Sequence, residues 1–216
     1  MSNLRTGTYG SYYGSYKGQS TPLTKSQMSV NATYIYKALT AKGWTINAVS
    51  ALLGNMQAES SINPGRWQSE DVGNTSMGYG MVQWTPATKY INWCSDNGYI
   101  DYSEMDSNIA RILYELENNV QWIATSSYNF SFKEFSKSNK APSYLAVSFL
   151  LNYERPADQS STVQKYRGEL ANSWYTYLTG VEPEQPSLTT KRKKRYNFIL
   201  FNRRKRQWTN RNFLNR

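Results

Sequence analysis

Apolar residues recur at three- and four-residue intervals over most of residues 24–180, a pattern typical of helices that bury one face. Glycine, proline and asparagine interrupt these runs and mark where each helix should end. The run 142–152 is nearly all apolar, so we expect it near the centre of the domain. The pattern predicts a mostly α-helical domain with helices over residues 31–42, 45–62, 85–98, 103–125, 142–152 and 160–178.

Four other segments lack this helical period. Residues 65–84 are rich in Gly, Ser and Asn, and we expect irregular structure there with a short strand or hairpin. Residues 1–23 form a Tyr/Gly/Ser-rich arm with too few aliphatic residues for a core, which predicts a segment that is flexible alone or ordered by a partner. Residues 181–190 contain two prolines and two glutamates and predict a stiff polar linker to the C-terminal tail, residues 191–216.

The positive charge of the chain is concentrated in that tail. Eleven of the 25 Lys and Arg residues lie there, with no acid among them, so the rest of the chain is nearly neutral against its 15 acids. Such a tail suits a nucleic acid or an anionic membrane surface, and we expect it to dock on a partner or polyanion; the alternative is a solvated tail without a dedicated partner. The aromatic residues that could stack or insert are Tyr196, Phe198, Phe201, Trp208 and Phe213.

The amino-acid composition excludes several kinds of catalytic and metal site. The chain has no histidine, which excludes Ser-His-Asp and Cys-His centres and zinc sites with histidine ligands. Cys94 is the single cysteine, so no intrachain disulfide can form, and we expect it to be a small buried residue. No apolar run reaches 18 residues, and the N-terminus lacks the hydrophobic stretch of a secretory signal. A hydrolase built from these residues must use carboxylates, hydroxyls and amides, and we expect no metal or organic cofactor.

Glu59 is the first candidate for such chemistry. It follows Leu52 and Met56 at helical spacing, so it should lie on the apolar face of its helix. It also lies near the end of that helix, because Asn63 and Pro64 cannot continue it. Burial and the negative helix end should both raise the pKa of Glu59, and glycoside cleavage needs such a protonated acid. The alternative is an ordinary solvated glutamate at a helix end.

The segment 77–86 is the second candidate. Gly78 and Gly80 flank Tyr79, which indicates a tight turn or a close approach of the backbone. Gln83 and Trp84 then place an amide beside a large aromatic ring, a combination that suits a sugar. Alone, a Gly-X-Gly turn is usually just a loop.

The two segments together resemble the phage tail lysozyme family of the lysozyme-like superfamily. The resemblance covers roughly residues 24–180 and not the basic tail. It implies an α+β lysozyme-like fold of two lobes, with a small irregular or β-hairpin segment beside the active-site helix. The matching residues are 31–36 (NATYIY), 43–45 (GWT), 53–60 (LGNMQAES), 63–67 (NPGRW), 80–86 (GMVQWTP), 152–156 (NYERP) and 171–175 (ANSWY).

The resemblance gives Glu59 the place of the catalytic acid. Glycosidases usually pair two carboxylates, and Asp71 and Glu70, in the loop after the acid, could position or activate a water. Some lysozyme-like enzymes depend mainly on one glutamate, so neither is required. Tyr153 and Glu154 are cleft candidates, although Glu154 could instead pair with Arg155 or Arg167. The full set of substrate-binding candidates is Ser60, Thr75, Tyr79, Gly80, Met81, Gln83, Trp84, Tyr153 and Glu154, with Ser76 as a further hydroxyl that could guide water.

The function implied is a muramidase that cleaves the β-1,4 bond between N-acetylmuramic acid and N-acetylglucosamine in peptidoglycan. We expect a virion-associated enzyme of a phage tail that opens the host wall during genome delivery, with other tail proteins as partners. The basic tail could then bind teichoic acid, another polyanion of the wall. Alternatives are a lytic transglycosylase that uses the same Glu59, an endolysin that acts late in infection, and a catalytically silent tail or wall-binding protein.

Overall fold

A central helix, α2 (Ile46–Ser60), organises the fold of residues 2–181, which are the residues described by this computed structural model. Most of the linker and all of the basic tail lie outside the described residues, and so do the expectations about them. The other elements are β1 (Asn3–Gly7), β2 (Gly10–Gly14), α1 (Lys25–Thr40), η1 (Gln68–Glu70), α3 (Thr88–Asp96), α4 (Met105–Glu117), α5 (Phe132–Lys137), α6 (Pro142–Phe149), η2 (Leu150–Glu154) and α7 (Ser161–Thr179).

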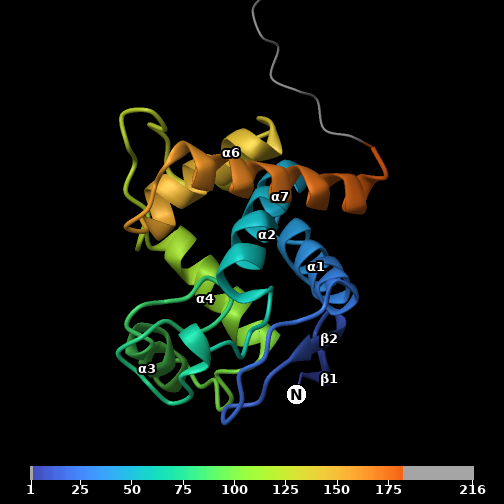
Figure 1. The fold of residues 1–216 in the computed structure, drawn as a ribbon, viewed down its shortest axis with the longest axis vertical. Helices are drawn as coiled ribbons and strands as arrows, with labels where there is room; N and C mark the ends of the chain where they lie inside the picture. The colour runs from blue at the N-terminus through green and yellow to red at the C-terminus, as the bar shows by residue number, and fades with distance from the viewer. Residues whose placement is uncertain (1, 182–216) are drawn as a thin grey trace, which may run out of the picture. The chain divides into compact units, whose positions relative to one another are not determined.

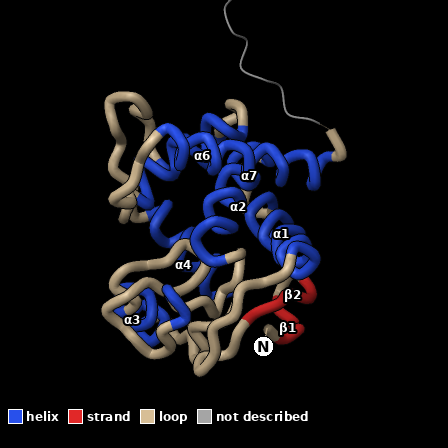
Figure 2. The backbone as a smooth tube through the Cα atoms, in the orientation of Figure 1, coloured by secondary structure: helices blue, strands red, loops and turns tan. Residues whose placement is uncertain are grey.

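The mostly helical, lysozyme-like fold class is confirmed. In Figure 1, α6 and α7 lie at the top, α2 runs down from them with α1 beside it, and α3 lies in the lower part beside an irregular segment. Figure 2 shows that loops make up much of that lower part, where the described residues also form one two-stranded antiparallel sheet. No helix of the described part is long and apolar enough to cross a membrane.

Helix α2 begins and ends where local chemistry dictates. The hydroxyl of Thr45 accepts a hydrogen bond from the backbone of Ala48 and caps the helix, as the sequence predicts. The helix stops after Ser60, because Ser61 and Ile62 adopt left-handed backbone angles (φ 56° and 55°). The helix packs against α1, α6 and α7, which holds its end firmly in place. Its fully buried apolar residues are Ala48, Val49, Ala51, Leu52, Leu53 and Met56.

The N-terminal segment differs from the expected flexible arm. Strands β1 and β2 form a hairpin, with Leu4 opposite Tyr13 and Arg5 opposite Tyr12. The Tyr12 side chain is 2% exposed and packs edge-on against Tyr34 of α1. Tyrosine rings supply here the buried area that the missing aliphatic residues would give.

Polar contacts attach the hairpin further. Arg5 forms an ion pair with Asp101 at 2.9 Å, and the buried side chain of Asn31 bonds the backbone of Tyr13 in both directions. Asn63, just beyond α2, accepts from the backbone N–H of Ser15 and donates to its hydroxyl. The segment therefore belongs to the folded body, because buried amides rather than aliphatic contacts fix its position.

Helix boundaries differ from the sequence prediction in several places. Helix α1 begins before residue 31 because Thr24 and Gln27 form a capping box. Helix α4 ends at Glu117 rather than near residue 125, since Asn119 has a left-handed backbone (φ 52°). Short α5, capped by Ser131 and Glu134, was not predicted, because six residues are too few to show a period. Helix α3 starts at Thr88, two residues after Pro86.

Candidate active site

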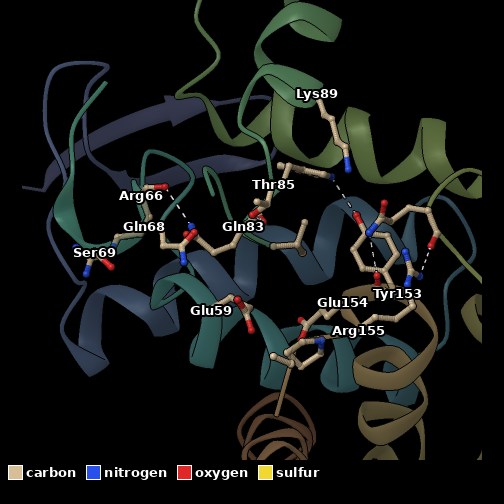
Figure 3. Close-up of a pocket in the computed structure, with 15 residues that line it drawn as sticks. Glu59, Arg66, Gln68, Ser69, Gln83, Thr85, Lys89, Tyr153, Glu154 and Arg155 are labelled. Carbon is tan, nitrogen blue, oxygen red and sulfur yellow. Dashed lines mark hydrogen bonds between the residues drawn. The ribbon is translucent and has the colours of Figure 1, made fainter. Parts of the chain in front are cut away.

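A pocket of about 720 Å³ opens beside the end of α2. Its walls come from five places in the chain: the end of α2, the irregular segment after it, the start of α3, the loop after α4, and the chain from η2 into the loop after it (Figure 3). The lining residues are Glu59, Arg66, Gln68, Ser69, Val82, Gln83, Trp84, Thr85, Lys89, Gln121, Tyr153, Glu154, Arg155, Pro156 and Ala157.

Glu59 occupies the next-to-last position of α2 and has a side chain that is 23% exposed. The residue after it fixes the helix end to the second candidate segment, because the buried Ser60 hydroxyl bonds the carbonyls of Met56 at 3.0 Å and Met81 at 2.8 Å. The acid therefore projects into the pocket from a helix end that is held in place.

An arginine from α7 meets this acid. Arg167 is 8% exposed and donates from Nη1 to the carbonyl of Asn55 at 2.8 Å, while its Nη2 contacts Oε1 of Glu59. The same Nη2 lies 3.5 Å from Oε2 of Glu154. Helix α7 can approach α2 this closely because Gly54 presents no side chain at the crossing, next to the backbone of Ala171.

Glu154 is the second pocket carboxyl, and it is nearly inaccessible, with 5% of its side chain exposed. It ends η2, a π-helical turn that follows α6; such turns are frequent at functional sites. Neither of its oxygens has a hydrogen-bond partner among the described residues. Burial, and after it the neighbouring Glu59 carboxylate, raises the pKa of Glu154 well above its usual range, against the opposing effect of Arg167.

A buried polar network supports the wall that carries Trp84 and Tyr153. Oε1 of Glu115 accepts from Nε1 of Trp84 at 3.0 Å and from Nε of Arg111 at 2.8 Å, and its Oε2 accepts from the Tyr153 hydroxyl. The Tyr153 hydroxyl also accepts from Nε1 of Trp84 at 3.1 Å. Burial raises the pKa of Glu115, while these hydrogen bonds and Arg111 oppose the shift. The network fixes both aromatic rings where they line the pocket.

Backbone strain also collects at the pocket. Ser69, Gln83, Gln121 and Arg155 all line it, and all have φ between 50° and 72°, a region that disfavours residues with a Cβ. Such strain persists only where surrounding contacts hold it, and it clusters at functional sites.

Two of these strained residues are secured by their own side chains. The Gln83 amide donates to the carbonyls of Gly80 at 2.8 Å and Arg66 at 3.2 Å. The Arg155 guanidinium donates to the carbonyls of Gln121 and Asn152, at 2.6 and 2.5 Å.

Of the residues that the sequence predicts for the site, the pocket brings together Glu59, Gln83, Trp84, Tyr153 and Glu154. Thr75 and Asp71 are exposed and do not line it, and Asp71 instead accepts a hydrogen bond from Asn74 at 2.7 Å. The turn between Gln68 and Met77 carries both away from the pocket, so neither is placed where the sequence suggested.

Four other predicted contact residues lie behind the wall instead of on its surface: Ser60, Tyr79, Gly80 and Met81 are all buried and outside the lining. Tyr79 packs against Trp67 and Tyr102. Gly80 has φ +84°, and a Cβ there would lie 2.8 Å from Oδ1 of Asn108. These residues support the pocket wall from behind, because their side chains or backbone pack into the core. The local sequence pattern did not reveal this burial.

Sequence reasoning did not identify Arg167 as a site residue, although it named it as a possible partner of Glu154. The sequence does contain a signal for it. Arg167, Ala171 and Trp174 share the buried face of α7 at helical spacing, so Arg167 is a cation on an otherwise apolar stripe. The other lining residues that were not predicted, among them Lys89, Gln121 and Arg155, carry no such local signal.

Known proteins include relatives of this chain. Residues 30–178 match the phage tail lysozyme family. The chain is also 52% identical over 158 residues to morphogenesis protein 1 of Bacillus phage B103; the alignment covers 73% of this chain and 42% of that protein. The chain thus spans less than half the length of this relative. Because the family match covers well over half of the residues, including α2, the pocket and α7, the chain belongs to the phage tail lysozyme family.

Proposed function

We propose that this protein is a muramidase that cleaves the β-1,4 bond between N-acetylmuramic acid and N-acetylglucosamine in peptidoglycan. The observation that carries the proposal is the position of Glu59, a carboxyl on a rigid helix end that opens into a pocket of about 720 Å³. Trp84 and Tyr153 are 4% and 1% exposed, so they support the pocket wall from behind rather than stack on a sugar as the sequence suggested. Gln83 is only partly buried, and it lines the pocket as a polar group beside them. Family membership supports a lysozyme-like role for this site.

In the proposed reaction, Glu59 donates a proton to the glycosidic oxygen as its bond to the anomeric carbon breaks. Both pocket carboxyls lie beside the same guanidinium, so they occupy one side of the reacting bond. The group that attacks the anomeric carbon is then a water molecule, which gives hydrolysis. If the C6 hydroxyl of the muramic acid attacks instead, the same acid supports a lytic transglycosylase, and the product carries an anhydro end.

We further propose that the enzyme is part of the phage tail and opens the host wall locally during genome delivery. The family and the phage relative support a phage tail setting for the chain. Peptidoglycan is the proposed substrate, and other tail proteins are the proposed partners. Detection of the protein in purified virions would support this role, whereas its absence there and its presence in lysates would indicate an endolysin.

The test of the activity is mass spectrometry of the soluble fragments that the protein releases from purified peptidoglycan. Glu59→Gln keeps the shape and removes the acid, so we expect a loss of about 10³-fold in rate with an unchanged fold. Glu169→Gln is the matched control, because Glu169 is an exposed glutamate of α7 that makes only a 3.7 Å ion pair with Lys165.

Reducing N-acetylmuramic acid ends that disappear in Glu59→Gln would support the muramidase. Anhydro ends would assign a transglycosylase, and reducing N-acetylglucosamine ends would mean cleavage of the other bond. If neither the native protein nor the control released any fragment, the chain would be a non-catalytic tail protein and the proposal would be wrong.

A further inference from the structure

Three charged side chains from three separate elements meet at the back of the pocket: Glu59 from α2, Glu154 from η2 and Arg167 from α7. Figure 3 shows the carboxyl groups of Glu59 and Glu154 turned toward each other. We propose that Glu154 carries, in the free protein, the proton that Glu59 later donates to the glycosidic oxygen. When this proton moves from Glu154 to Glu59, Arg167 shifts its ion pair from Glu59 to Glu154. This inference rests on the proposed function and deepens it.

Charge balance is the first step of the argument. If both carboxyls were ionised, the three groups would carry a net charge of −1 in a place where Glu154 is 5% exposed and Arg167 is 8% exposed. An unbalanced buried charge is costly, and one proton shared by the pair removes it. Both carboxyls lie at the same nitrogen, Nη2 of Arg167, in contact with it for Glu59 and 3.5 Å from it for Glu154. Carboxyls that share a site in this way titrate as a unit, so the pair keeps a proton at a pH where an isolated glutamate would have lost it.

The position of that proton follows from the contacts. Glu59 is 23% exposed and in direct contact with Arg167, so its charge is stabilised by both solvent and a cation. Glu154 has neither advantage: its oxygens lack any hydrogen-bond partner among the described residues, and the nearest guanidinium nitrogen is 3.5 Å away. In the free protein the proton therefore lies on Glu154, and Glu59 is the ion-paired carboxylate.

This arrangement is the wrong one for catalysis, which requires the proton on Glu59. A sugar ring in the pocket covers the exposed part of Glu59 and removes the water that stabilises its charge. The proton then passes from Glu154 to Glu59, and Arg167 pairs with the newly ionised Glu154. Glu59 gives the proton to the leaving oxygen, and the attacking water releases one proton, which returns to the pair. Protons are thus conserved over one turnover.

The remaining charged groups near Glu154 do not replace Arg167. The Arg155 guanidinium is occupied by the carbonyls of Gln121 and Asn152. Arg66 is ion-paired with Glu70 at 3.3 Å, and in Figure 3 both Arg66 and Lys89 lie away from Glu154. Glu59 and Arg167 are therefore the charged groups that face Glu154. Glu154 is a positioning residue in this scheme, because it acts through Glu59 and not on the sugar itself.

The first experiment reads the proton directly and does not require activity. Carbon-13 NMR of the glutamate side-chain carboxyls follows the protonation of each residue across pH, and Glu154→Gln identifies the resonance of Glu154. We expect that resonance to keep its protonated shift well above the ordinary pKa of a glutamate. A resonance of Glu154 that titrates at that ordinary pKa would overturn the proposal, even if the protein proved to be an active muramidase.

The second experiment measures kcat/KM on soluble peptidoglycan fragments as a function of pH. In Glu154→Gln no carboxyl stores the proton, and Arg167 keeps Glu59 ionised. The alkaline limb of the plot of kcat/KM against pH should therefore move to lower pH. At neutral pH kcat should fall about 10- to 100-fold while KM changes less than about threefold. Glu169→Gln should reproduce the native profile. A uniform loss of activity with an unmoved limb would mean that Glu154 is only structural, and would overturn the proposal.

Arg167→Lys provides an opposite and independent prediction, which also covers the case in which Glu154→Gln does not fold. A lysine cannot bond the carbonyl of Asn55 and serve both carboxyls, so the carboxylate forms lose stabilisation. The alkaline limb should therefore move to higher pH. If it moves to lower pH, or does not move, Arg167 does not set the position of the proton and the proposal is wrong. If the native protein releases no fragments, the proposed function fails, and the NMR experiment alone decides whether the proton is held.

Discussion

Glu115 and Glu154 are both buried carboxyls beside an arginine, yet their surroundings are opposite. Glu115 is 1% exposed, and both of its oxygens accept hydrogen bonds, from Arg111, Trp84 and Tyr153. Glu154 is 5% exposed, and neither of its oxygens has a partner among the described residues. Tyr153 joins the two, because its hydroxyl bonds Glu115 and it directly precedes Glu154 in η2.

The difference indicates that Glu115 has a structural role and that Glu154 has a role in the proposed reaction. A buried carboxylate that is fully hydrogen-bonded fixes its neighbours, and its removal should be felt mainly as lost stability. A buried carboxyl without partners lowers stability, and a protein keeps such a group where its proton has a use. The contrast can be tested by making the same Glu→Gln change at both positions.

The largest expected effect is on Glu115→Gln. The change leaves Arg111 buried without its counter-charge and weakens the bonds to Trp84 and Tyr153, so the free energy of unfolding should fall by about 3 kcal/mol. Glu154→Gln should change it by less than about 1 kcal/mol, because the neutral amide has nearly the size and the charge of a protonated carboxyl. Urea denaturation at pH 7 measures both variants. Equal losses would break the distinction between the two sites.

The next largest effect is expected from Gly54→Ala, which tests whether the crossing of α2 and α7 places Arg167. A Cβ at this position would lie 2.7 Å from the backbone nitrogen of Ala171 and 3.0 Å from the carbonyl oxygen of Arg167. The helices must separate, at about 2 kcal/mol of stability. Because Arg167 then moves away from Glu59, activity should fall further than the lost stability explains.

Gly18→Ala is the control for this change, since nothing lies within 4 Å of its added carbon. It should alter stability by less than about 0.5 kcal/mol. Urea denaturation and fragment release measure the two effects separately. Full activity in a folded Gly54→Ala variant would show that the close crossing does not position the site.

A smaller effect concerns the pH dependence of stability. The pKa of Glu154 is raised in the folded state, so the folded protein keeps a proton that the unfolded chain releases above the ordinary pKa of glutamate. The contribution of Glu154 to the free energy of unfolding is therefore complete at pH values below the ordinary pKa of glutamate. It is lost as the pH rises toward the raised pKa of Glu154, by at most about 1.4 kcal/mol per pH unit.

Glu154→Gln removes this contribution, so the variant should lose less stability than the native protein as pH rises. Comparing the two proteins by urea denaturation between pH 4 and pH 8 isolates Glu154, because the raised pKa of Glu115 contributes to both. Parallel stability curves would contradict the proton-holding role.

The smallest effect is expected from Asp71→Asn. Asp71 is exposed, bonds Asn74 and does not line the pocket, so kcat should change less than about threefold. Steady-state rates on peptidoglycan fragments, with Glu59→Gln as the inactive reference, measure this. A loss of tenfold or more would restore Asp71 as the second catalytic carboxylate and would move the attacking water to its side of the pocket.

The sequence alone determined the elements and the position of the acid along them. The apolar spacing through Leu52 and Met56, the cap at Thr45 and the breakers after Ser60 place Glu59 at the end of a helix, and the structure agrees. Local chemistry suffices there, because caps and apolar periods act within a few residues. The same local pattern predicted a flexible arm over residues 1–23, and this was wrong. Tyrosine rings and buried amides hold that segment in place of aliphatic contacts.

Only the tertiary structure decided what surrounds the acid. Arg167 lies 108 residues from Glu59 along the chain, and the packing of α2 against α7 brings them into contact. The orientation of Glu154 depends on the π-helical turn after α6, and the exposure of Asp71 depends on the course of an irregular segment. Sequence spacing carries no information about such long-range contacts, and the protonation of a carboxyl is set by the burial and charge that these contacts create.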